Sequence, residues 1–157
     1  MKFSKNDLIF IPLGGSGEIG MNCNLYHYNG SWIMIDLGVM FGNSSMSPNE
    51  LIMPDLSFLH ENKIKLSALI LTHAHEDHIG AIAHLWPKLK CKIFATPFTA
   101  VLIKEKFREK HIDITKDLQI VELNGNVLLE DFEIEYITLT HSILEPNGLR
   151  IKTPAGV

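Results

Sequence analysis

The stretch that decides the fold is residues 69–80, which read Leu69-Ile70-Leu71-Thr72-His73-Ala74-His75-Glu76-Asp77-His78-Ile79-Gly80. A short apolar run, typical of a buried strand, ends at Thr72, and four side chains that can bind metal follow within six positions. His73 and His75 are two apart, so an extended backbone points both imidazoles to the same side. Asp77 then opens a helix expected over residues 77–85. Imidazoles with a carboxylate suit zinc or a related transition metal, so the stretch predicts a metal site rather than a solvated polar turn.

The composition is that of one ordinary folded domain. With 157 residues, 46% of them hydrophobic, the chain can bury one core. Its net charge of −4 gives no overall basic surface for nucleic acid, so such a partner would be held locally or by metal. Cys23 and Cys91 form no CxxC pair, which argues against a disulfide framework and a thiolate zinc site. No stretch approaches a membrane span, so we expect a cytoplasmic protein with no membrane partner.

A glycine-rich segment follows an expected strand over residues 8–11 that Pro12 should end, and it reads Gly14-Gly15-Ser16-Gly17-Glu18-Ile19-Gly20. It contains the spacing GxGxxG, which in dinucleotide-binding units leads into a helix whose N-terminus holds a pyrophosphate. Here two β-rich runs, residues 24–28 and 31–35, flank an Asn-Gly pair and indicate a hairpin instead. We therefore expect the glycines to make a tight turn or to let backbone pass close to the site.

Asp36 closes the second strand of that hairpin, and the sequence leaves two interpretations open. It is either an ordinary turn residue at a strand end or a carboxylate that orients a metal-binding histidine, which such sites commonly need.

The remaining elements indicate a layered α/β fold. Pro87 should end the helix that Asp77 opens. We expect a second helix over 98–110, strands over 91–95, 118–123, 127–129, 132–137 and 148–152, and a surface loop over 42–54. The strand over 132–137 leads to His141, which follows a strand end as His73 does. The last strand lacks a hairpin partner and is expected to leave an unpaired edge.

Three stretches resemble a known family. The segment HAHEDHIGA at residues 73–81 looks like the HxHxDH motif of the metallo-β-lactamase superfamily. The segment GGSGEIGMN at 14–22, and Thr140-His141-Ser142-Ile143 followed by Glu145-Pro146-Asn147, narrow the resemblance to the ribonuclease J branch of the beta-CASP nucleases. The implied fold is an αβ/βα sandwich with the site at strand ends. Residues 1–157 would form a partial metallo-β-lactamase domain, with the beta-CASP and C-terminal parts absent.

The resemblance also implies site residues and a cofactor. His73, His75 and His141 would hold one metal, and Asp77 and His78 a second; the bridging Asp that the family uses is not present. Zinc, as one or two ions, is the expected cofactor, with manganese possible. Asp77, His78 and Ser142 would be the catalytic residues, Asp77 as a possible proton acceptor and Ser142 as a hydrogen-bond donor to phosphate.

The implied activity is metal-dependent phosphodiester hydrolysis in RNA processing or decay, with RNA as the partner of the complete enzyme. A single metal at the three-histidine site is better supported than a competent pair, so this chain alone is expected to be inactive or nearly so. Two alternatives remain: a small-molecule metallo-hydrolase acting on a thioester or lactone, and an inactive metal-binding remnant. A complementary C-terminal polypeptide or a second copy of the chain would then be a partner.

Overall fold

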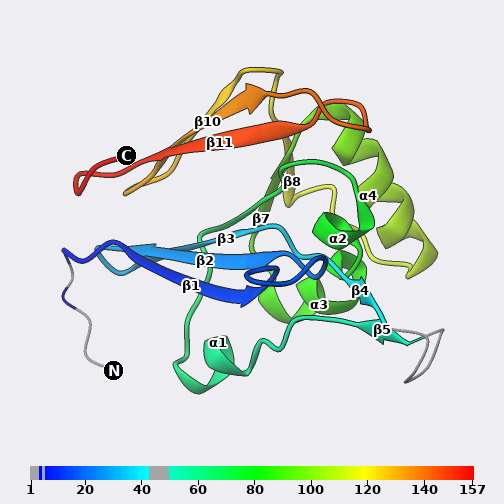
Figure 1. Ribbon diagram of the computed structural model, residues 1–157, viewed down its shortest axis with the longest axis horizontal. Helices are drawn as coiled ribbons and strands as arrows, with labels where there is room; N and C mark the ends of the chain where they lie inside the picture. Colours follow the sequence, from blue (N-terminus) through cyan, green and yellow to red (C-terminus); the bar gives the residue numbers. More distant parts are fainter. Residues whose placement is uncertain (1–3, 5, 43–49) are drawn as a thin grey trace.

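The computed structural model describes residues 4, 6–42 and 50–157 and arranges them in layers (Figure 1). A six-stranded sheet has the order β1-β2-β3-β6-β7-β8, a three-stranded sheet has the order β11-β10-β9, and β4 pairs with β5. The strands are β1 (Ile9–Gly14), β2 (Cys23–Tyr28), β3 (Ser31–Ile35), β4 (Met40–Phe41), β5 (Leu51–Ile52), β6 (Ala68–Ile70), β7 (Lys92–Ala95), β8 (Leu118–Ile120), β9 (Asn126–Leu128), β10 (Glu133–Thr138) and β11 (Asn147–Lys152). The helices are α1 (Ser57–Glu61), α2 (Glu76–Ile79), α3 (Ile82–Leu89) and α4 (Pro97–Glu109).

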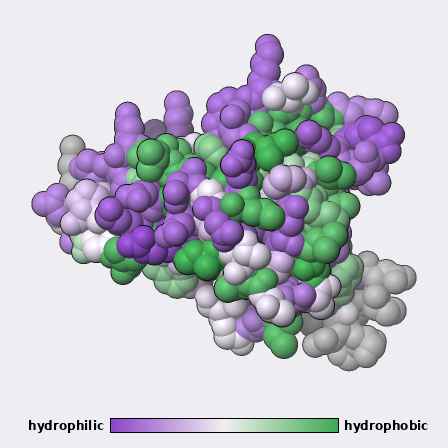
Figure 2. Space-filling view, turned by 90° about the horizontal axis from the view of Figure 1, so that it is seen from above, coloured by the Kyte–Doolittle hydropathy of each residue, from purple (hydrophilic) through white to green (hydrophobic). Residues whose placement is uncertain are grey.

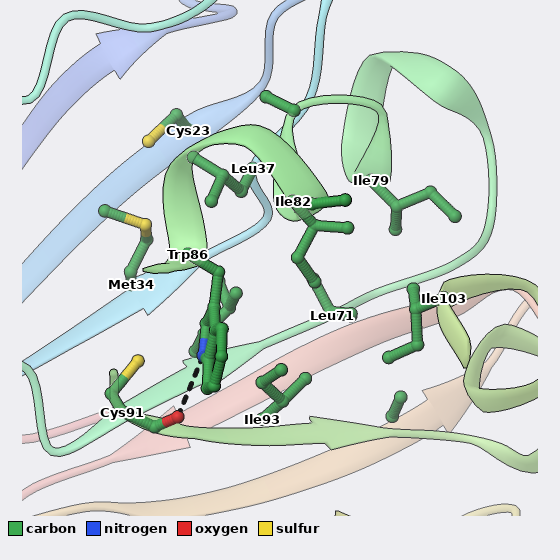
Figure 3. Packing of buried hydrophobic residues seen from close by; sticks show 14 of the residues in the cluster. Cys23, Met34, Leu37, Leu71, Ile79, Ile82, Trp86, Cys91, Ile93 and Ile103 are labelled. Atoms are coloured by element: carbon green, nitrogen blue, oxygen red, sulfur yellow. Dashed lines mark hydrogen bonds between the residues drawn. The ribbon is translucent and has the colours of Figure 1, made fainter. Parts of the chain in front are cut away.

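The main core lies between the six-stranded sheet and the helices. Strand residues such as Met34 and Ile93 pack there against Ile82 and Trp86 of α3 and Ile103 of α4 (Figure 3). Each fully buried aliphatic side chain of this kind contributes roughly 1.5–3 kcal/mol. The strands β3, β6 and β7 are parallel neighbours, so their carboxyl ends meet at one edge of the sheet. No helix of the described residues is both long and apolar enough to cross a membrane.

A second core joins the two sheets. Ile134 and Tyr136 of β10 are fully buried against Ile33 and Ile70 of the six-stranded sheet. The Tyr136 hydroxyl donates a hydrogen bond of 3.1 Å to the backbone carbonyl of Phe94, which ties the sheets together. The helix layer and the two sheets agree with the expected layered α/β fold.

The outer face of the three-stranded sheet mixes charged and apolar residues, as the view from above shows (Figure 2). On this face Nζ of Lys152 lies 2.9 Å from Oε2 of Glu133, and Nη1 of Arg150 lies 3.1 Å from Oε2 of Glu135. Each ion pair joins residues that are directly opposite each other in β10 and β11. Leu128 is exposed on the same face. These side chains are therefore exposed or paired with one another within the described part of the chain.

The structure corrects several expected boundaries. Strand β1 continues through Pro12, because β1 is an edge strand and a residue without an N–H is tolerated there. The single helix expected over 77–85 is two helices, α2 and α3, and Pro87 lies inside α3 rather than ending it. Pro87 is the sixth of eight residues, and α3 ends two residues after it.

Three further points concern strand pairing. The strands expected over 118–123 and 127–129 lie in different sheets, so the turn between them crosses from one layer to the other. All six residues of β11 pair with β10 on one side, and its other edge is unpaired among the described residues, as expected. The loop expected over 42–54 contains β5, which pairs with β4, and residues 43–49 of that loop lie outside the described residues.

Both cysteines lie in the main core (Figure 3), and burial raises the pKa of each thiol to about 12. The thiolate is the reactive form of cysteine. We therefore expect neither thiol to react with Ellman's reagent in the folded chain at mildly alkaline pH, and both to react after unfolding in guanidinium chloride. The released thionitrobenzoate measures this, and a fast-reacting thiol in the folded chain would contradict the packing described.

Candidate metal centre

Three strand ends deliver the site residues. β6 runs directly into His73 and His75, and α2 begins one residue later. β3 lies beside β6 and delivers Asp36, whose N–H donates a 2.9 Å hydrogen bond to the carbonyl of Ile70. The connection between β10 and β11 carries His141 and passes close to α4 (Figure 1).

Three histidines form one compact group. Nε2 of His73 lies 3.2 Å from Nδ1 of His75, and Nε2 of His141 lies 3.2 Å from the same atom. The ligand nitrogens of all three lie within 4.8 Å of one another. His73 is buried, His75 is half-buried and His141 is exposed, so the group is open to solvent on one side.

This donor set fits a metal ion. A tetrahedral ion bound 2.0–2.1 Å from imidazole nitrogens needs those nitrogens roughly 3.3 Å apart. Two of the three pairs of nitrogens in the group are already near that distance. The three histidines also leave a fourth position open, as in catalytic zinc sites with three protein ligands. The residues present therefore fit a divalent metal.

Asp36 orients two of the site histidines. Its Oδ2 accepts a hydrogen bond of 2.7 Å from Nδ1 of His78 and one of 2.8 Å from the hydroxyl of Thr72. Because that hydroxyl donates its proton to Asp36, its oxygen accepts from Nδ1 of His73, 2.9 Å away. Both rings then carry their proton on Nδ1 and present the Nε2 lone pair, which is the form a metal ligand needs.

Of the two interpretations that the sequence leaves open, this geometry supports Asp36 as the orienting carboxylate. It is also buried, with 3% of its surface exposed, and accepts a 2.8 Å hydrogen bond from the N–H of Thr72 through Oδ1. Its backbone has a φ of 60°, so the strand-end turn is present as well.

The protonation of the group follows from burial and charge. Burial, and then the neighbouring imidazole of His78, lower the pKa of His73 to about 4. Its ring is therefore neutral at neutral pH and has a lone pair to offer. Burial alone would lower the pKa of His78, but the hydrogen bond and charge of Asp36, with Asp77, outweigh it and raise that pKa.

Asp77 and His78 form a second pair beside the three histidines. Oδ2 of Asp77 lies 3.4 Å from Nε2 of His78. The amide nitrogen of Asn22 bridges them, 3.2 Å from each of these two atoms and 3.1 Å from the backbone carbonyl of Asp77. No carboxylate of the described residues joins the compact group of three histidines.

Ser142 and the glycine-rich segment, which the sequence also singles out, lie outside the compact group of three histidines. Ser142 is exposed, next to His141, and no hydrogen-bond partner is described for it. The glycine-rich segment precedes a strand and no helix, so it has no dinucleotide-binding context. A Cβ on Gly14 or Gly15 would overlap Met21 or Asn22, so these glycines allow the close backbone approach that brings Asn22 to the site.

Sequence reasoning does not identify Asn22, Thr72, Glu145 or Asn147 as part of the site's surroundings. The only signal for Asn22, Glu145 and Asn147 is their place in the stretches that carry the family resemblance, and Thr72 stands out only as the end of a strand.

The chain matches a known protein family and several named relatives. The family model described as "Metallo-beta-lactamase superfamily" matches residues 17–143. The chain is 41% identical over 156 residues to a protein named ribonuclease J from Sinorhizobium meliloti, covering 96% of this chain and 27% of that protein. It is 33% identical over 158 residues to ribonuclease J 2 of Staphylococcus aureus, covering 99% of this chain and 28% of that protein.

Solved structures show the same fold at low identity. The metallo-beta-lactamase fold protein YhfI from Bacillus subtilis matches with a TM-score of 0.59 at 17% identity, over 93% of this chain and 58% of that one. The chain thus spans a little over half of this structure, and less than a third of the two ribonuclease J relatives.

Proposed function

The chain belongs to the metallo-beta-lactamase superfamily, and we propose that it supplies the metal-binding part of a metal-dependent ribonuclease that hydrolyses phosphodiester bonds in RNA. One observation carries the proposal: the residues that line the three-histidine group lie in a chain that resembles ribonuclease J proteins along nearly its whole length. We further propose that residues 1–157 form part of one metallo-beta-lactamase domain, acting on RNA in the cytoplasm.

We propose that His73, His75 and His141 hold one zinc ion, with manganese as a substitute, and that Asp77 and His78 contribute to a second metal position. A divalent metal bound there would lower the pKa of a water molecule, so that hydroxide forms near neutral pH, and would neutralise negative charge on the scissile phosphate. One tightly held metal per chain is the expected state, because only the three-histidine group is compact among the described residues.

The chain's own residues have distinct tasks in this proposal. Asp77 has a side chain that is 38% exposed, so its carboxylate can take up a proton at the open side of the site. The exposed hydroxyl of Ser142 can donate a hydrogen bond to a phosphate oxygen. Asp36 holds His78 and, through Thr72, His73 in the tautomers that present Nε2.

A chimera tests the proposal. Residues 1–157 replace the matching part of the Sinorhizobium meliloti ribonuclease J, and the purified chimera is given a 5′-labelled single-stranded RNA with zinc or manganese. We expect metal-dependent cleavage, lost on addition of a chelator. Asp77→Ala and His75→Ala in the chimera should reduce cleavage to the metal-free level with circular dichroism unchanged.

The matched control is His60→Ala, which removes an exposed imidazole away from the site and should leave cleavage intact. A folded, metal-loaded chimera that hydrolyses a thioester but leaves RNA intact would overturn the ribonuclease proposal in favour of a small-molecule hydrolase. Equal RNA cleavage by the His75→Ala chimera would show that this chain's histidines do not support the reaction.

A further inference from the structure

His141 stands on a loop that the sheet alone does not fix. Residues 139–146 connect β10 to β11, and the loop is closed at its base by a 2.9 Å hydrogen bond from the N–H of Leu139 to the carbonyl of Pro146. His141 is exposed, and its described hydrogen-bonding contact is to Nδ1 of His75. A single 3.2 Å contact at an exposed imidazole does not fix the whole loop, so the contacts at its base are the candidates for what sets the position of His141.

Glu145 anchors the loop to the start of α4. Its Oε2 accepts a 2.8 Å hydrogen bond from the N–H of Phe98, the second residue of that helix. The N-cap residue Thr96 makes no capping hydrogen bond to the backbone; its hydroxyl faces that of Thr99 at 3.5 Å. Glu145 therefore supplies, from 47 residues away, the acceptor that a helix N-terminus needs, and its negative charge suits the helix dipole.

Asn147 anchors the base of the same loop to the strand end that bears the other histidines. It is buried, with 5% of its surface exposed. Its Nδ2 donates to the carbonyl of Thr72 at 3.0 Å and to the carbonyl of Glu145 at 2.8 Å. Thr72 directly precedes His73, so one amide group links the backbone beside His73 to the loop of His141.

This link depends on the amide nitrogen of Asn147. Both of its described hydrogen bonds are donated by Nδ2, and its Oδ1 has no hydrogen-bond partner among the described residues. A carboxylate at this position would set an oxygen against two carbonyl oxygens.

We propose that Glu145 and Asn147 are positioning residues that hold His141 against His75 and so preform the three-histidine group. The inference rests on the proposed metal centre. The two anchors attach the His141 loop to the start of α4 and to the end of β6, which are both packed on the main core. The side chain of Ile143, on the same loop, also packs against that core.

The test measures metal affinity rather than activity. Zinc binding to the 157-residue chain is followed by competition with a chromophoric chelator, and cobalt binding by its visible absorption, which reports ligand number and geometry. Glu145→Ala is expected to weaken zinc binding about 10-fold, the lower end of the losses typical when a group that orients a metal ligand is removed, because Glu145 acts on His141 through the loop and not by direct contact. Glu145→Gln keeps an acceptor oxygen and should retain most of the affinity and the cobalt spectrum.

A double-mutant cycle separates positioning from general destabilisation. In a His141→Ala background, Glu145→Ala should cause no further loss of zinc affinity, because the ligand that it positions is already gone. The isosteric Asn147→Asp should weaken zinc binding in the same way as Glu145→Ala, in a chain whose circular dichroism is unchanged. If Asn147→Asp fails to fold, the cycle of Glu145→Ala and His141→Ala still distinguishes positioning of His141 from general destabilisation.

Two results would overturn the inference and are distinguishable from failure of the metal centre itself. An unaltered chain that binds zinc, with Glu145→Ala binding as tightly, would remove the positioning role. If Glu145→Ala lowers zinc affinity equally in the presence and in the absence of the His141 imidazole, Glu145 stabilises the fold in general and does not position His141. No zinc binding by the unaltered chain would overturn the metal centre, and this inference with it.

Discussion

Replacing His75 and His141 together by alanine is expected to reduce zinc content from about one ion per chain to none. The change removes two of three nitrogens that lie within 4.8 Å of one another and leaves only the buried His73. A single protein ligand does not hold zinc against dialysis, since catalytic sites need about three. Metal content after dialysis, measured by mass spectrometry, gives the result directly.

The matched control removes two imidazoles elsewhere. His60 and His84 are both exposed and on helices, so His60→Ala with His84→Ala should leave zinc content unchanged. Unchanged zinc in the His75 and His141 double variant would remove the three-histidine assignment, while loss in both variants would point to a non-specific effect of histidine number.

Gly38→Ala is expected to destabilise the chain by about 3 kcal/mol or more, the upper end for overpacking. A Cβ at Gly38 would overlap the carbonyl of Asp77 and lie 2.7 Å from the N of His78. Backbone on both sides is fixed, since the N–H of Gly38 donates to the carbonyl of Asn22 at 2.9 Å and the N–H of Leu37 to that of His78 at 2.8 Å. Neither segment can retreat without breaking hydrogen bonds of the site. Urea denaturation followed by circular dichroism measures the loss.

Gly148→Ala is the control for this change. The nearest atoms to a Cβ there belong to the flexible side chain of Leu139, the first at 3.3 Å. A cost under about 1 kcal/mol is expected, because a side chain can move where a backbone cannot. Equal, small effects of the two substitutions would show that the backbone of the α2 turn is not packed against Gly38 as described.

The sequence predicts those features of the site that depend on neighbours in the chain. His73 and His75 share a side because alternation along an extended backbone is a local property, and the apolar run ahead of them marks a buried strand. The same signal, a histidine after a strand end, points to His141. Local rules of this kind are sufficient to name the candidate ligands from the sequence.

Contacts between distant residues cannot be predicted in the same way. Asn22 meets Asp77 across 55 positions, and Glu145 meets Phe98 across 47, so no periodicity connects them. Asp36 is ambiguous in the sequence because its role depends on β3 lying beside β6, a parallel pairing that the sequence does not specify. The Asn-Gly turn signal at residues 124–125 likewise does not tell whether the next strand joins the same sheet, and β8 and β9 lie in different sheets.

The most direct test of the central proposal, a zinc centre built on His73, His75 and His141, is X-ray absorption at the zinc edge of the loaded 157-residue chain. A zinc centre on these residues predicts imidazole scattering from about three nitrogen ligands at roughly 2.0–2.1 Å, reduced to at most one in the His75→Ala, His141→Ala double variant if any zinc remains. A sulfur ligand at roughly 2.3 Å, or the same imidazole count in the double variant, would contradict it.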